Sequence, residues 1–194
     1  MASSTWLLHV NTSYPLPVPC PPPPSTSNRY YSAFHYYGRR KADGFGSPRQ
    51  FHERTLQDIQ RWNDCKSRLS ELECIRRYNP QQLIKGMYSE FVQAWLGVFP
   101  KDQVLFLRTE DYKAASREHL AAVLKFLGMR DLTQDEWQRI TGAKRANAQS
   151  SMYPRMLPET RQLLEDFYAP YNKRLAALLQ DDRYLWRDRT IPAE

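Results

Sequence analysis

Hydrophobic side chains recur at spacings of three and four residues along most of this chain. The helical spacing runs through Phe51 to Trp62, Leu83 to Val98, Leu120 to Leu127 and Leu163 to Leu179. A capping box, Thr133-Gln-Asp-Glu136, predicts the start of one more short helix, which carries Trp137. Three residues are expected to interrupt this pattern: Pro100 and Gly128 end helices, and Pro170 kinks or breaks the last one.

One apolar stretch departs from the helical spacing. Val104-Leu-Phe-Leu107 is uninterrupted and bounded by charge, which is typical of a strand buried on both faces of a parallel sheet. A buried strand needs neighbours that satisfy its backbone groups, so we expect a helix-rich α/β fold whose other strands lie N-terminal to this one. Arg108, Glu110 and Asp111 follow the strand. Glu110 and Asp111 are either a catalytic acid/base pair or, as we favour, caps of the next helix and partners of a nearby arginine.

The first 27 residues differ in composition from the remainder. Serine, threonine and proline dominate there, and the stretch includes four consecutive prolines at 21–24. We interpret residues 1–27 as a disordered or poorly ordered leader and residues 28–190 as one folded portion. No apolar run approaches the roughly 18 residues that span a bilayer, and no targeting signal is visible.

The formal net charge of +7 favours an anionic partner, such as a nucleotide, an acidic glycan or nucleic acid. A solvated basic surface accounts for the charge equally well, because the basic residues are scattered. The sequence contains no Walker loop, glycine-rich dinucleotide loop, zinc-ligand set or Gly-x-Ser-x-Gly elbow. The histidines show no ligand spacing and are expected at surface or packing positions: His9, His35, His52 and His119.

Cys65 and Cys74 lie nine residues apart in a polar, charged connection between helices. They are either two free thiols or, as we favour, a disulfide that adds roughly 2–3 kcal/mol by restricting the unfolded chain. A disulfide would imply an oxidising compartment.

The segment from Asn28 to Gly38 combines five aromatic residues with Arg29 and a lone Ser32 in one expected helix. A hydroxyl among aromatic and basic side chains can donate a hydrogen bond to an anion. From these residues alone, the simpler interpretation is a surface serine on a helix whose aromatic residues pack.

Three separated segments resemble, in order and spacing, motifs of the Golgi carbohydrate sulfotransferases. Gly86–Pro100 resembles their "G-x-Y … W-L-x-x-F" helix, and Gln103–Asp111 resembles the strand and acidic turn that follow it. Asp166–Leu175 is similar to their closing "D-F-Y-x-P-[FY]-N-x-x-L" helix. Phe51-His52-Glu53 and the cysteine pair are similar to the subfamily that sulfates N-acetylgalactosamine 4-sulfate at its 6-O position. The resemblance covers about residues 28–187.

This resemblance implies transfer of a sulfuryl group from 3′-phosphoadenosine 5′-phosphosulfate (PAPS) to a hydroxyl of chondroitin or dermatan sulfate, without a metal or a nucleic-acid partner. It also implies a location in the Golgi lumen or at the Golgi membrane. The implied fold is P-loop-like, with three layers around a parallel sheet, and this chain supplies its C-terminal part. Ser32 matches the family's "R-x-Y-S" segment and is expected to bind the 3′-phosphate of PAPS. Lys144 and Arg145 fall where the family has basic residues that contact phosphate or glycan.

Pro24 stands where the family has an arginine, eight residues before the serine of that segment. The leader also contains neither a lysine nor an acid that could bind the 5′-phosphosulfate or act as the base. We therefore expect a truncated enzyme with impaired catalysis and assign no catalytic residue. The alternative is a non-catalytic remnant that binds an anionic glycan or a nucleotide.

Overall fold

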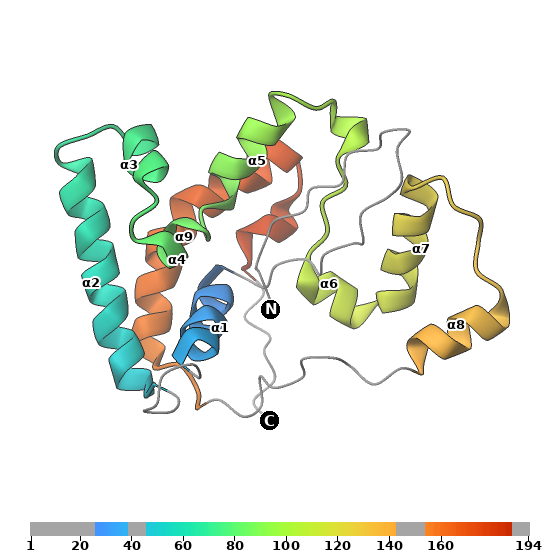
Figure 1. Ribbon diagram of the computed structural model, residues 1–194, viewed down its shortest axis with the longest axis horizontal. Coiled ribbons are helices and arrows are strands. Elements are labelled where there is room, and N and C mark those ends of the chain that lie inside the picture. Colours follow the sequence, from blue (N-terminus) through green and yellow to red (C-terminus); the bar gives the residue numbers. More distant parts are fainter. Residues whose placement is uncertain (1–25, 39–45, 143–153, 188–194) are drawn as a thin grey trace. The chain divides into compact units, whose positions relative to one another are not determined.

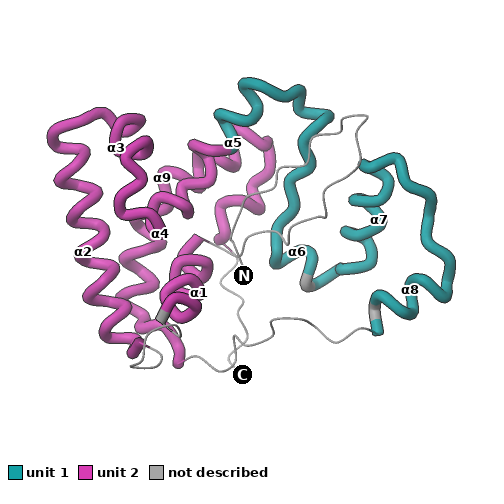
Figure 2. Tube along the Cα trace, in the orientation of Figure 1, with its two compact units in different colours: residues 1–24, 92–147 teal, residues 25–91, 148–194 magenta. Residues whose placement is uncertain are grey.

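The computed structural model describes residues 26–38, 46–142 and 154–187, and these residues form helices and turns (Figure 1). The chain divides into two compact units (Figure 2). The first contains residues 92–142 of the described part, and the second contains residues 26–38, 46–91 and 154–187. The expected richness in helix is confirmed.

The second unit, which carries the candidate site, contains α1 (Thr26–Gly38), α2 (Pro48–Lys66), α3 (Glu71–Arg77), α4 (Gln81–Ile84), the start of α5 (Tyr88–Leu96), α9 (Pro158–Leu179) and a 3-10 turn, η3 (Asp182–Leu185). The first unit contains the rest of α5, a 3-10 turn, η1 (Lys101–Gln103), α6 (Thr109–Ala114), α7 (Ser116–Phe126) and α8 (Gln134–Thr141). The predicted capping box at Thr133 is present, and equivalent boxes begin α2 at Ser47 and α3 at Ser70.

Helix α1 begins at Thr26, two residues before the segment in which we expected it. Thr26 and Ser27 are both buried, so these two residues of the predicted leader are part of the folded unit. The rest of that leader, residues 1–25, lies outside the described residues.

Helix α9 is central to the second unit, because it packs against α1, α2 and η3. It stays helical for 22 residues, so Pro170 does not break it. A proline inside a helix removes one backbone hydrogen bond, and burial of the side chains on both sides of Pro170 offsets that loss. The core of the unit is formed by Tyr30, Phe51, Trp62, Cys74, Ile75, Leu83, Ile84, Met87, Met156, Leu164, Tyr168 and Tyr171.

The single helix predicted from Leu83 to Val98 is in fact two helices, α4 and α5, separated around Gly86. The Tyr168 ring of α9 occupies this break. Its hydroxyl donates a 2.8 Å hydrogen bond to the carbonyl oxygen of Leu83. A Cβ at position 86 would lie 2.6 Å from the ring, so only glycine permits this approach. Val98, predicted on the buried face, is 73% exposed.

The strand predicted at Val104–Leu107 does not form among the described residues. Val104 and Arg108 have extended backbone angles, and Val104 takes part in one isolated β-bridge. Leu105, Phe106 and Leu107 are half-buried rather than enclosed. Local sequence can favour an extended backbone, but a strand also requires a neighbour that pairs along its length. The described residues accordingly contain no parallel sheet and no three-layer arrangement.

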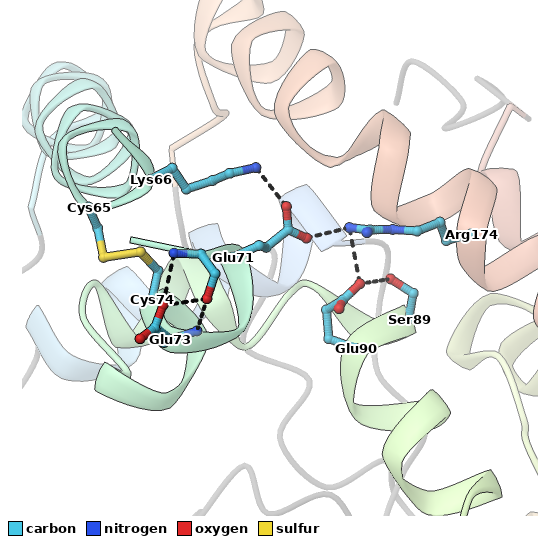
Figure 3. Close-up of polar contacts among 9 residues, drawn as sticks. Cys65, Lys66, Glu71, Glu73, Cys74, Ser89, Glu90 and Arg174 are labelled. Atoms are coloured by element: carbon cyan, nitrogen blue, oxygen red, sulfur yellow. Dashed lines mark hydrogen bonds and ion pairs between the residues drawn. A yellow bond between two sulfur atoms is a disulfide. The ribbon is translucent and has the colours of Figure 1, made fainter. Parts of the chain in front are cut away.

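The predicted disulfide between Cys65 and Cys74 is present, with a Cα–Cα distance of 5.9 Å. Both cysteines belong to helices, Cys65 to α2 and Cys74 to α3, rather than to the connection in which we placed them. Close by, the Glu71 carboxylate accepts hydrogen bonds from Lys66 at 2.6 Å and from Arg174 at 2.7 Å (Figure 3). The disulfide therefore joins α2 to α3, and an ion pair joins the first residue of α3 to α9.

We expect Gly86→Ala to lower the free energy of unfolding by about 1–3 kcal/mol, because the added methyl group overpacks against the Tyr168 ring. Urea unfolding followed by circular dichroism measures this change. Gly97→Ala is the matched control, because the nearest atom to a Cβ there is the Ala94 carbonyl oxygen at 3.4 Å. Equal losses in the two variants would contradict a specific contact at position 86.

We expect the double substitution Cys65→Ala/Cys74→Ala to lower the free energy of unfolding by about 2–3 kcal/mol, because the bond closes a short loop in the unfolded chain. Urea titrations with and without reductant measure the effect. Reductant should destabilise the parent chain by a similar amount and leave the double variant unchanged. A parent chain that is insensitive to reductant would show that the disulfide does not contribute to stability.

Candidate functional site

Ser32, the residue expected to bind the 3′-phosphate, is exposed on α1. Its aromatic neighbours pack on one ring of α2: the centroids of Tyr30, Tyr31 and Phe34 lie 5.0, 4.8 and 5.1 Å from that of Phe51. The Ser32 hydroxyl makes no side-chain hydrogen bond within the described part of the chain. It is thus available to a ligand from solvent.

A buried carboxylate anchors the residue two positions before this serine. The Tyr30 hydroxyl donates a 2.6 Å hydrogen bond to Asp58 of α2. Arg54 and Arg61 contact the same carboxylate at 3.0 and 3.3 Å. Burial, together with the adjacent Asp58 charge, raises the pKa of the Tyr30 phenol, so Tyr30 stays neutral and remains a donor.

Two further contacts hold α1 from other directions. The buried Arg29 guanidinium donates to the backbone carbonyl oxygen of Gln82 at 2.9 Å and to its side-chain oxygen at 3.3 Å. The Tyr31 hydroxyl donates a 2.5 Å hydrogen bond to the carbonyl oxygen of Pro154. Three consecutive residues, 29–31, thus bind α4, α2 and the segment that precedes α9. Sequence analysis did not predict these anchors, because each partner is at least 28 residues away along the chain.

Lys144 and Arg145, the other residues expected to bind the nucleotide or glycan, lie outside the described residues. Pro154 belongs to the basic loop that the sequence places between Gly142 and Pro158, and it contacts Tyr31. The roles of Ser32, Lys144 and Arg145 remain predictions.

The acids near residue 110 have the structural role that we favoured. Glu110 and Asp111 lie in the first turn of α6, a helix that the sequence pattern did not predict. Negative side chains at this end of a helix are favourable for its dipole. Asp111 also forms an ion pair with the buried Arg108 at 3.6 Å.

The histidines that the structure describes occupy packing positions, as predicted. Nδ1 of His52 lies 2.8 Å from the hydroxyl oxygen of Thr160 on α9. Nδ1 of His119 lies 2.7 Å from the carbonyl oxygen of Ala115, and His35 is fully buried. His9 lies outside the described residues.

Within the described ranges, no three histidine, cysteine or acidic side chains lie close enough together to hold a metal ion. The helices of these same ranges are all too short or too polar to cross a membrane.

Comparison with known proteins agrees with the motif resemblance. A rat protein named carbohydrate sulfotransferase 15 is 31% identical over an alignment of 170 residues, and the match covers 82% of this chain and 29% of the rat protein. A protein of the same name from Nototodarus sloanii is 28% identical over an alignment of 133 residues, and the match covers 64% of this chain and 84% of that protein. This chain therefore spans less than a third of the length of the mammalian relative.

A solved structure shares the fold. The crystal structure of a sulfotransferase from Alicyclobacillus acidocaldarius superimposes with a TM-score of 0.56 at 23% identity, over 85% of this chain and 55% of that one. The family model described as "Sulfotransferase domain" matches residues 27–165, a range that includes all of α1 except Thr26 and extends into the start of α9. The chain therefore belongs to the sulfotransferase domain family.

Proposed function

We propose that this chain takes part in moving a sulfuryl group from PAPS to a sugar hydroxyl of a glycosaminoglycan. The proposed acceptor position is the 6-O of N-acetylgalactosamine 4-sulfate in chondroitin or dermatan sulfate, and the proposed location is the Golgi lumen or membrane. Family membership and the similarity to carbohydrate sulfotransferase 15 support this proposal. The observation that carries it is Ser32, exposed on a helix that is anchored on three sides.

In this reaction the acceptor hydroxyl loses its proton to a base and its oxygen bonds to sulfur, while the bond from sulfur to the 5′-phosphate oxygen breaks and adenosine 3′,5′-bisphosphate leaves. The 3′-phosphate of the donor lies away from the reacting sulfur. Binding it therefore orients the donor without taking part in bond exchange. A hydroxyl that donates to the phosphate is suited to that task, because hydrogen bonds to ionised acceptors are short and strong.

The anchors of α1 suit a binding helix because they fix the serine before a ligand arrives. Tyr30 is joined to a buried acid, and Arg29 to a backbone carbonyl group, so neither depends on a ligand for its position. A site whose supporting contacts already exist loses less conformational entropy on binding. Lys144 and Arg145 are proposed as additional contacts to phosphate or glycan from the basic loop.

A second candidate function is binding of an anionic glycan or nucleotide without catalysis. It is favoured by the contacts of one acid and one histidine within the described residues. Asp111 pairs with Arg108, and His52 contacts Thr160. Both groups therefore have structural partners in this chain.

We expect Ser32→Ala to weaken binding of adenosine 3′,5′-bisphosphate (PAP) about tenfold or more, because a hydrogen bond to a charged group contributes about 1.5–3 kcal/mol. Isothermal titration calorimetry on the full chain measures this affinity. Ser116→Ala is the matched control, since Ser116 is also an exposed helical serine but lies on α7.

No PAP binding by the parent chain at millimolar concentration would exclude its use of the donor. Equal affinity of the parent and the Ser32→Ala variant would place the nucleotide elsewhere. Transfer of radioactive sulfate from PAPS to chondroitin 4-sulfate separates the two candidate functions. Binding without transfer would select the non-catalytic one.

A further inference from the structure

A basic hollow of about 340 Å³ lies where α2 turns into α3, and it belongs entirely to the second unit. It is lined by Arg61, Asp64, Cys65, Arg68, Arg77 and Asn79. A smaller adjoining hollow of about 190 Å³ shares Cys65, Arg68 and Arg77 and adds Leu69. Three arginines against one aspartate leave a net charge of +2 around the larger hollow.

The arginines of this hollow retain donors for a ligand. Arg61 donates through one terminal nitrogen to the Asp58 carboxylate at 3.3 Å, and Arg68 donates through Nε to the backbone carbonyl oxygen of Asp64 at 3.0 Å. Arg77 makes no hydrogen bond or ion pair with any residue that the structure describes. Each guanidinium carries five N–H donors in a planar fork, so most of the donors here face water.

The hollow is built on a fixed corner. The disulfide joins Cys65, which lines it, to Cys74 of α3. The capping box at Ser70 and the ion pair of Lys66 with Glu71 hold the turn between the two helices. Because these bonds fix the backbone that carries the arginines, a ligand does not have to order that backbone on binding.

Helix dipoles explain part of this arrangement but not the hollow itself. Arg76 and Arg77 lie in the last turn of α3, where positive side chains are favourable. That explanation applies equally to both residues. Of these two residues, however, only Arg77 lines the hollow. The other two arginines of the lining come from α2 and from the turn that follows α2.

The lining favours an acidic saccharide over a nucleotide. Guanidinium groups bind sulfate and carboxylate oxygens in pairs, and three of them surround this space. The described lining has no aromatic ring on which an adenine could stack. The volume lies near the lower end of the range of about 300–1,000 Å³ that is usual for ligand pockets, which suits a short charged unit of a longer polymer.

We propose that this hollow, lined by Arg61, Arg68 and Arg77, binds a sulfate or carboxylate group of an acidic polysaccharide at a site separate from Ser32. The choice of ligand rests on the proposed function, in which the acceptor is a sulfated glycosaminoglycan. Such a site holds the polymer at a distance from the reacting hydroxyl, so it contributes to acceptor affinity rather than to the chemical step.

The test compares two double variants of the full chain that each lose two positive charges. Arg68→Gln/Arg77→Gln changes the hollow, and Arg76→Gln/Arg139→Gln changes exposed arginines outside it. Calorimetry at about 0.15 M salt, where charges more than about 8 Å apart are largely screened, measures binding of a chondroitin 4-sulfate octasaccharide. We expect about tenfold weaker binding in the first variant and less than about twofold in the second.

Equal weakening of octasaccharide binding in both double variants would show that binding responds to net charge alone, and it would contradict the proposed site. Failure of the parent chain to bind the octasaccharide would overturn it as well. If Arg68→Gln/Arg77→Gln abolished PAP binding instead, the hollow would be a nucleotide site and the saccharide assignment would be wrong. Failure of the proposed function would give a different result from failure of this site. The parent chain would then bind the octasaccharide but not PAP.

Discussion

The contact of the Tyr168 ring with Gly86 is the constraint on which the site-bearing unit depends. The ring fills the break between α4 and α5, and its hydroxyl donates to the Leu83 carbonyl oxygen, which also accepts a 3.0 Å hydrogen bond from the Gly86 amide. Burial raises the pKa of the Tyr168 phenol, so the hydroxyl remains a donor. By fixing α4, this contact fixes Gln82, the residue to which Arg29 of α1 is bonded. The position of the candidate phosphate-binding helix therefore depends on a tyrosine more than 130 residues away.

Helix α2 connects the two proposed anion sites. Its Asp58 accepts hydrogen bonds from Tyr30, beside Ser32, and from Arg61, which lines the basic hollow. An acid that is almost fully buried would be costly alone, and the two arginines and the phenol around it supply the compensation. The same carboxylate thus positions the helix of one site and one arginine of the other. A chain that handles a nucleotide and a sulfated polymer needs such separate sites, because the two ligands present their charges differently.

Features governed by neighbouring residues could be predicted from sequence. The cap at Thr133 and the left-handed Gly128 that ends α7 depend on backbone and side chains within a few positions. The errors share another cause. The helix break at Gly86 was decided by a distant partner, and the strand at Val104 does not form because no neighbour pairs with it along its length within the described residues. Periodicity records which side chains are apolar, but it does not record which element packs against them.

The sequence by itself determined the family and the helical content, because motif order and periodicity are written along the chain, and it favoured the pairing of Cys65 with Cys74 that the structure then showed. It also nominated Ser32. Only the tertiary structure decided that Ser32 lies exposed on a helix anchored at three consecutive positions. It also decided that Arg61, Arg68 and Arg77 surround one hollow. Arg61 and Arg68 lie seven residues apart, which is a helical spacing, but no local period brings Arg77 to them. They meet because the α2–α3 corner folds back on itself and a disulfide holds it, and convergence of that kind depends on contacts that no local pattern encodes.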